Sequence, residues 1–197
     1  MMQTEIEATF LAINHDELRA KLQAAGATLV QPMYLMKRSI YDYADLRLDQ
    51  QKSWIRVRQE ADKVTMGFKQ RESETADGMR EIEFEISDYA KACEFLEAIG
   101  LKTKAVQESK REVWRLDDCE VTLDEWPWIP QYVEVEGPSE NAVRDVSAKL
   151  GLTYEAAVFD SIDIIYIKFF DVTRTEISSV PIAFGPVPRW LEKKRRA

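Results

Sequence analysis

The sequence predicts an α+β protein in which about eight strands, mostly antiparallel, carry three or four helices. Three observations predict this class. A unit made of a strand with a Glu-x-Glu pair, a capped helix and a terminal glycine occurs three times at unequal intervals. Several other segments alternate polar and apolar residues, which is typical of strands with one buried face. The links between segments are short, and short links favour antiparallel pairing.

Composition and charge limit what the protein binds. Its 197 residues, 45% of them apolar, suffice for one domain with a sizeable core. The formal net charge of −8 argues against a nucleic-acid partner, which requires a basic face. Cys93 and Cys119 form no C-x-x-C pair and fit a reducing compartment. The sequence contains neither a signal-peptide pattern nor a membrane-spanning run, so we expect a cytoplasmic protein without a membrane partner.

The repeated unit predicts three strand–helix pairs. In the first, Asn14 is the expected N-cap of a helix with apolar residues at helical spacing. In the second and third, the helices follow Ser87-Asp88 and Pro138-Ser139. The predicted strands cover residues 5–10, 81–86 and 133–136, and the helices end at Gly26, Gly100 and Gly151.

Between these units the pattern predicts further strands. They cover residues 39–48, 53–59, 63–70, 110–116 and 120–125, with a loop at 72–78 and a hairpin turn at Asp117-Asp118. A helix is expected over 158–170. Residues 1–170 are predicted to form one domain, and residues 171–197 an irregular C-terminal tail that packs through Phe184 and Trp190.

The two faces of the predicted strands differ sharply, one being apolar and the other densely charged with both signs. An open sheet would leave the charged face in water. Eight strands are also enough to close a barrel, with helices covering the apolar outside and the charged face turned inward. The pattern alone allows both arrangements.

The charged face carries residues suited to metal and phosphate together. Its acids are Glu5, Glu7, Glu81, Glu83, Glu85, Asp124, Glu134 and Glu136, and its bases are Arg56, Arg58 and Lys69, with Arg38, Arg80, Lys110 and Arg111 less clearly placed. An all-oxygen ligand set suits Mg²⁺, Mn²⁺ or Ca²⁺ rather than zinc. Arginine forks and lysine point charges suit phosphate oxygens. The alternative is that each charged strand simply faces solvent.

Seven short motifs, in order, resemble one known family. They are E-I-E-A-T at residues 5–9, I-Y-D-Y-A-D-L-R-L at 40–48, W-I-R-V-R at 54–58, G-F-K at 67–69, R-E-I-E-F-E at 80–85, K-R-E-V-W at 110–114, and L-D-E-W-P followed by Y-V-E-V-E at 123–136. The chain resembles the CYTH domains, or triphosphate tunnel metalloenzymes, which include class IV adenylyl cyclases, thiamine triphosphatases and inorganic triphosphatases.

The resemblance implies an eight-stranded antiparallel closed barrel, or tunnel, that binds a small-molecule triphosphate or nucleotide. It implies Mg²⁺ or Mn²⁺ held by Glu5, Glu7, Asp124, Glu134 and Glu136. It implies phosphate binding by Arg38, Arg56, Arg58, Lys69, Arg80, Lys110 and Arg111, with Lys69, Arg56 and Arg58 as the catalytic residues and Glu81, Glu83 and Glu85 as supporting acids. Association into a homodimer is left open.

Three functions follow from the resemblance. The first is metal-dependent hydrolysis of a triphosphate, inorganic or organic. The second is adenylyl cyclase activity, because K-R-S-I-Y-D at residues 37–42 resembles the bacterial cyclase branch. The third is a weakened nucleotide- or polyphosphate-binding module, because Thr9 stands where the E-x-E-x-K motif has lysine; Lys37 or Lys110 are candidates to compensate. Trp126 and Trp128 are expected to pack a loop, the alternative being that one of them stacks on a base.

Overall fold

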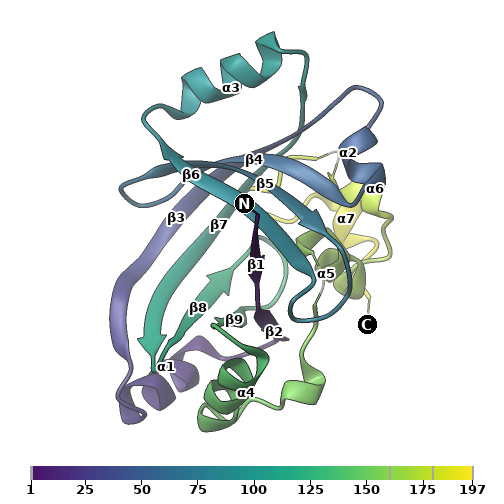
Figure 1. The fold of residues 1–197 in the computed structure, drawn as a ribbon. Helices are drawn as coiled ribbons and strands as arrows, with labels where there is room; N and C mark the ends of the chain where they lie inside the picture. Colours follow the sequence, from purple (N-terminus) through teal and green to yellow (C-terminus); the bar gives the residue numbers. More distant parts are fainter. Residues whose placement is uncertain (1, 160, 179, 197) are drawn as a thin grey trace.

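A computed structural model describes residues 2–159, 161–178 and 180–196, and it shows a mixed α+β fold built on one antiparallel sheet (Figure 1). The sheet contains nine strands in the order β1-β6-β5-β4-β3-β7-β8-β9-β2. The strands are β1 Gln3–Glu5, β2 Glu7–Leu11, β3 Thr28–Asp42, β4 Ser53–Gln59, β5 Val64–Arg71, β6 Met79–Ile86, β7 Lys102–Leu116, β8 Cys119–Glu125 and β9 Tyr132–Glu136. The mixed class and the antiparallel pairing are confirmed.

The N-terminal strand accounts for the difference between eight predicted strands and nine observed ones. It is split at Ile6: β1 pairs with β6, whereas β2 pairs with β9, so the two pieces form opposite ends of the ladder. The hydrogen-bonded ladder therefore does not close, and the predicted closed barrel is not confirmed. The chain nevertheless brings the two ends together at Ile6, whose carbonyl accepts from the amide of Gly137 at 3.0 Å, and next to it the amide of Glu7 donates to the carbonyl of Ala76 at 3.1 Å.

The three repeated units form as predicted because each helix is capped. The side chains of Asn14, Asp88 and Ser139 accept hydrogen bonds from first-turn amides. The helices are α1 His15–Ala24, α2 Arg47–Gln50, α3 Tyr89–Ala98, α4 Glu140–Lys149, α5 Ile162–Phe169, α6 Arg174–Ser178 and α7 Arg189–Glu192, with a 3₁₀ turn at Tyr154–Ala156. None of the helices that the structure describes is long and apolar enough to cross a membrane.

The helices cover the apolar face of the sheet. Leu18 and Leu22 of α1 and Val143 of α4 pack against strand residues such as Val121 and Val133, all of them buried. Around α3, Leu96 packs in a second cluster with residues of β3 and β4. The charged side chains that line the cavity are thereby left on the other face of the sheet, away from α1, α3 and α4.

The C-terminal segment packs differently from the sequence-based expectation. The helix predicted over 158–170 starts only at Ile162, and Val158 instead forms a bridge with Thr9. Phe184 and Trp190 are 38% and 36% exposed. The contacts with Trp126, Tyr132 and Tyr166 are made instead by the buried side chains of Val172, Ile177, Ile182 and Leu191.

Two strands, β3 and β7, are displaced from, or longer than, their predicted ranges of 39–48 and 110–116; β7 already starts at Lys102. β3 starts at Thr28, and its pairing with β7 shifts register between Gln31 and Tyr34, on either side of Pro32. It ends at Asp42, whose carboxylate accepts from the amides of Leu48 and Asp49 and so holds the short helix α2. The proline obscured the start of this strand, because proline cannot donate to a ladder.

Candidate functional site

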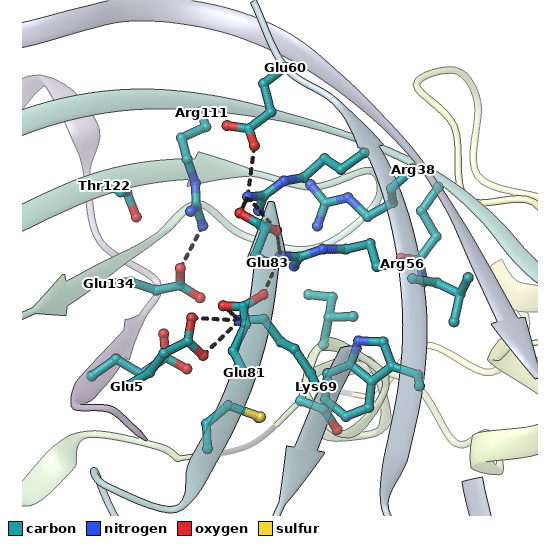
Figure 2. Close-up of a pocket in the computed structure, with 18 of the residues that line it drawn as sticks. Glu5, Arg38, Arg56, Glu60, Lys69, Glu81, Glu83, Arg111, Thr122 and Glu134 are labelled. Atoms are coloured by element: carbon teal, nitrogen blue, oxygen red, sulfur yellow. Dashed lines mark hydrogen bonds and ion pairs between the residues drawn. The ribbon is translucent and has the colours of Figure 1, made fainter. Parts of the chain in front are cut away.

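The charged face of the sheet lines a cavity of about 780 Å³. Every one of the nine strands contributes side chains to its lining, and further lining residues come from 161–178, from the loop at 60–63, and from Asp49 and Trp126. Figure 2 shows acidic and basic side chains from several strands pointing toward one another across this cavity.

Four arginines and one lysine meet in the cavity. Arg56 and Arg58 are two residues apart on β4 and so lie on the same face. Arg38 of β3 lies directly opposite Arg58, because these two residues are register partners. Lys69 comes from β5 and Arg111 from β7. Alternation within each strand thus places five cations on one surface.

Glutamates of β6 hold the β4 arginines. The guanidinium of Arg56 donates to Glu83 at 2.6 Å and to Glu81 at 3.1 Å. Arg58 pairs with Glu83 at 3.0 Å and with Glu60 at 2.7 Å. Burial opposes ionisation of Glu83, but Arg56 and Arg58 outweigh it and lower its pKa to about 2. These pairs fix the guanidinium groups in place before any ligand arrives.

Lys69 lies between two acids. Its ammonium donates to Glu5 at 2.7 Å and to Glu81 at 3.2 Å (Figure 2). Burial raises the pKa of Glu81 to about 8, and the hydrogen bond with Glu5 adds to the shift. For Glu5, burial is outweighed by Glu81 and Lys69, so its pKa falls to about 2. The Glu5–Glu81 pair therefore holds a proton next to Lys69 near neutral pH.

Arg38 differs from the other four cations. It is 7% exposed, and the hydrogen-bond partners of its guanidinium among the described residues are Met36 and Ser109, neither of them a carboxylate. Its guanidinium bonds to the Ser109 hydroxyl and lies 4.5 Å from the centre of the Trp126 ring, while its Nε has no partner in the described structure. Burial and the nearby Arg58 lower the pKa of Arg38 to about 9, so it is still charged at neutral pH. A buried, uncompensated guanidinium is costly unless an anion joins it.

Arg111 forms ion pairs with two acids, one on β8 and one on β9. It donates to Asp124 at 2.8 Å and to Glu134 at 2.5 Å. Asp124 is fully buried behind the cavity wall and also accepts from the Thr122 hydroxyl. Burial raises the pKa of Glu134 to about 7, against the pull of Arg111. Asp124 therefore positions Arg111 and does not line the cavity itself.

Glu7 and Glu136 are the acids best suited to a metal ion. They are register partners on β2 and β9, both line the cavity, and within the described residues neither carboxylate has a side-chain hydrogen bond or ion pair. Burial raises the pKa of both carboxyls, and Glu5 adds to the effect on each. No group of three or more potential metal ligands is assembled in the described part of the chain. The donor chemistry fits a hard divalent cation, with this pair as its centre.

The structure brings most of the predicted site residues together. Those lining the cavity are Glu5, Glu7, Arg38, Arg56, Arg58, Lys69, Glu81, Glu83, Arg111, Glu134 and Glu136. Arg80, Lys110 and Glu85 do not line it. Arg80 pairs with Glu72 and Lys110 with Glu125, and both side chains are at least 40% exposed. Strand alternation is the reason, since Arg80 and Lys110 are each one residue from an inward-facing neighbour.

Several lining residues were not predicted. Glu60 follows β4, Tyr34 lies four residues before Arg38 on β3, and Arg71 lies two residues after Lys69 on β5. Tyr34 and Arg71 continue the alternation of predicted residues, so the spacing was a usable signal. Trp126, expected to shape a loop, is buried against Arg38, and Trp128 donates to the Gly185 carbonyl. Lys37 and Lys110 do not line the cavity.

The fold and the site define a class of α+β proteins whose sheet turns a charged face onto an internal cavity. The chain belongs to the CYTH domain family: the family model matches residues 3–161. A comparison with curated proteins gives no match.

Solved structures share the fold at low sequence identity. The PH1012 protein of Pyrococcus horikoshii OT3 has a TM-score of 0.67 and 20% identity, over 80% of this chain and 96% of that one. A candidate adenylate cyclase from Vibrio parahaemolyticus has a TM-score of 0.73 and 17% identity, over 84% and 98%. A candidate adenylyl cyclase from Hippeastrum with a dominant triphosphatase activity has a TM-score of 0.55 and 15% identity, over 80% and 91%.

Proposed function

We propose that this protein binds a triphosphate in the cavity and hydrolyses it with the help of Mg²⁺ or Mn²⁺. The observation that carries this proposal is Arg38, a buried guanidinium with no carboxylate partner among the described residues, beside three further arginines and Lys69. Such a cluster needs a polyanion to compensate it. A linear triphosphate supplies several oxygens along its length, which suits cations spread over β3, β4, β5 and β7.

In this proposal, residues on one side of the cavity bind the phosphates and residues on the other side bind the metal ion. On one wall, Arg38, Arg56, Arg58 and Lys69 hold phosphate oxygens and stabilise the charge that develops as the bond to the leaving phosphate breaks. On the other wall, Glu7 and Glu136 would hold the divalent cation, with Glu5 and Glu134 next to them. A bound Mg²⁺ or Mn²⁺ would polarise phosphate oxygens. The paired acids Glu81 and Glu83 keep the cations in position.

A tunnel-shaped site is part of the proposal. The ends of the sheet, β1 and β2, are consecutive in the chain, and all nine strands line the same cavity. A sheet curled around the substrate would exclude water from most of the triphosphate, which strengthens the electrostatic contacts.

Two alternatives have specific support. Cyclase activity is favoured by the 37–42 segment and by the likeness of fold to candidate cyclases. A weakened binder is favoured by Thr9, which is buried, pairs with Val158 and does not line the main cavity. Neither Lys37 nor Lys110 lines the cavity in its place, whereas Arg71 lines both the main cavity and the small one beside Thr9.

One assay separates these functions. The protein is incubated with Mg²⁺ or Mn²⁺ and either ATP, inorganic triphosphate or thiamine triphosphate, and phosphate, pyrophosphate and cyclic AMP are measured. Hydrolysis is expected to release phosphate without cyclic AMP. Cyclic AMP with pyrophosphate would establish the cyclase instead. Absence of product, with a triphosphate still raising the melting temperature, would leave binding alone.

A further inference from the structure

Arg71 lies where the main cavity meets a small cavity of about 10 Å³. It stands two residues after Lys69 on β5, so its side chain leaves the same face of the sheet. A cavity of this size holds at most about one water molecule, so the residues that line it are close neighbours. They include Glu7 and Thr9 of β2, which places Arg71 beside the strand that carries a candidate metal ligand.

The guanidinium of Arg71 has no acidic partner among the described residues. Within the part of the chain that the structure describes, its side chain donates only to the Phe159 carbonyl. By contrast, Lys69 and the cavity-lining arginines of β4 and β7 each pair with two carboxylates. A guanidinium has five N–H donors, so one carbonyl leaves most of these donors and the whole charge available. Such a group is suited to bind phosphate through two parallel N–H bonds.

The bond to Phe159 holds the Arg71 side chain in a defined place. Phe159 follows Val158, which exchanges two backbone hydrogen bonds with Thr9 of β2, at 2.8 and 3.2 Å. The segment 157–159 thereby links β2 to the last residue of β5. Because the half-buried side chain is already held, binding a ligand costs it little further conformational entropy.

Thr9 supplies no charge to this part of the cavity. It is 4% exposed, lines the small cavity but not the main one, and follows Glu7 on the same face of β2. Arg71 reaches the same small cavity from β5 and also lines the main one. A positive charge is therefore present beside Glu7, although β2 does not provide it.

We propose that Arg71 binds the phosphate group that lies next to Glu7 and Glu136, and that it supplies the positive charge that Thr9 lacks. Arg71 keeps its bond to Phe159 and donates its remaining N–H groups to this phosphate. The threonine at residue 9 is then compensated, and the protein needs no lysine there for full affinity. This inference rests on the proposed function, because it assumes that a triphosphate enters the cavity.

The first test measures the affinity of inorganic triphosphate for the wild type, Arg71→Gln and Arg71→Lys. Calorimetry is done in metal-free buffer, so that metal-dependent turnover does not consume the ligand. Glutamine still donates to the Phe159 carbonyl but removes the charge, whereas lysine keeps the charge. Arg71→Gln should weaken binding roughly 10- to 150-fold, as expected for the loss of one charge-assisted hydrogen bond. The loss in Arg71→Lys should be at least threefold smaller.

A second test asks whether positions 9 and 71 serve the same phosphate. Thr9→Lys should raise affinity at least tenfold when it is combined with Arg71→Gln. In the wild-type background it should raise affinity less than threefold, because Arg71 already provides the charge. An equal gain in both backgrounds, or no gain in either, overturns the shared role.

Controls keep the outcomes distinct. Arg144→Gln removes an arginine of α4 that lines neither cavity, and it should leave affinity unchanged. Arg71→Met is the second uncharged variant if Arg71→Gln fails to fold. Unchanged affinity in the uncharged variant, or an equal loss in Arg71→Lys, overturns the proposal and leaves the proposed function intact. Failure of inorganic triphosphate, ATP and thiamine triphosphate to bind the wild type, with and without Mg²⁺, overturns the proposed function as well.

Discussion

At the scale of single residues, Arg38 shows how position determines chemistry. The sequence presents it between Lys37 and Ser39 as one basic residue among many. In the fold, Lys37 turns outward to within 3.8 Å of Glu108, whereas Arg38 is buried against Trp126. Burial without a carboxylate partner among the described residues suits Arg38 to its proposed role in binding an anion, whereas alternation along β3 makes its neighbour an ordinary surface lysine.

Arg38→Met is expected to weaken triphosphate binding without lowering the stability of the ligand-free protein. Removing a buried, uncompensated charge should leave the melting temperature of the ligand-free protein unchanged or higher. Affinity for a triphosphate should fall roughly 10- to 150-fold, because a charge-assisted hydrogen bond contributes about 1.5–3 kcal/mol. Lys37→Met is the matched control and should leave affinity unchanged. A marked fall in the melting temperature of ligand-free Arg38→Met would contradict this account.

Glu134 should make stability depend on pH. Burial raises its pKa to about 7 in the fold, from 4.5, so the folded state holds a proton that the unfolded state has released. The stabilisation is complete below about pH 4.5 and is lost as pH rises through about 7, by up to about 3 kcal/mol. Denaturant unfolding in metal-free buffer from pH 5 to pH 8 should show this decline in the wild type and a shallower one in Glu134→Gln. Equal slopes in the two proteins would refute the assignment.

At the scale of elements, the sheet depends on a close approach of β5 and β6. Gly67 faces the inner side of β5, and a Cβ there would lie 3.0 Å from the carbonyl oxygen of Ile82 and 3.4 Å from the Glu81 carboxylate. A strand glycine of this kind marks a place where another segment of backbone, here β6, approaches closely. This one leaves room for the acids that hold Arg56 and Lys69.

Gly67→Ala is therefore expected to affect both fold and site. Overpacking of this kind costs about 1–3 kcal/mol, which chemical denaturation would measure. Because the methyl group displaces Glu81 and its neighbour Glu83, triphosphate affinity should fall in the same variant. Full stability together with unchanged affinity would show that β6 moves aside freely.

The ranges of strands and the caps of helices were predicted correctly where they depend only on residues close together in the sequence. The range of β4, residues 53–59, agrees with the structure, because its alternation of Arg56 and Arg58 with Val57 has no interruption. The caps Asn14 and Asp88 likewise bond within their own first turns. The break at Ile6 was not predictable in this way, since it depends on two strands, β6 and β9, that are distant in sequence.

At the scale of the whole molecule, residues 171–178 and 180–196 pack against the sheet. Ile177 is fully buried in a cluster with Trp126, Tyr166 and Phe170. The amide of Ile182 donates to Val106 of β7 at 3.0 Å. We keep the proposal of a domain over residues 1–170 with a C-terminal tail, and we expect the domain to need the tail for stability.

Ile177→Ala tests that dependence. Deleting a buried isoleucine side chain costs about 2–5 kcal/mol, and the loss should appear in the single unfolding transition of the whole protein. Trp190→Ala, at a side chain that is 36% exposed, should cost much less. A separate low-temperature transition that leaves the main one unchanged would indicate that the tail folds on its own.

The sequence by itself determined the α+β class, the antiparallel strands and most residues of the charged face, because alternation and capping act between neighbours a few residues apart. It also carried the resemblance to the CYTH family. Only the tertiary structure decided which charges meet. It paired Arg111 with Asp124 and Glu134, turned Arg80 and Lys110 outward, and left Arg38 without an acid partner in the described part of the chain. The physical reason is that the interaction of two charges depends on their separation and burial, and both are set by strand register across the whole sheet.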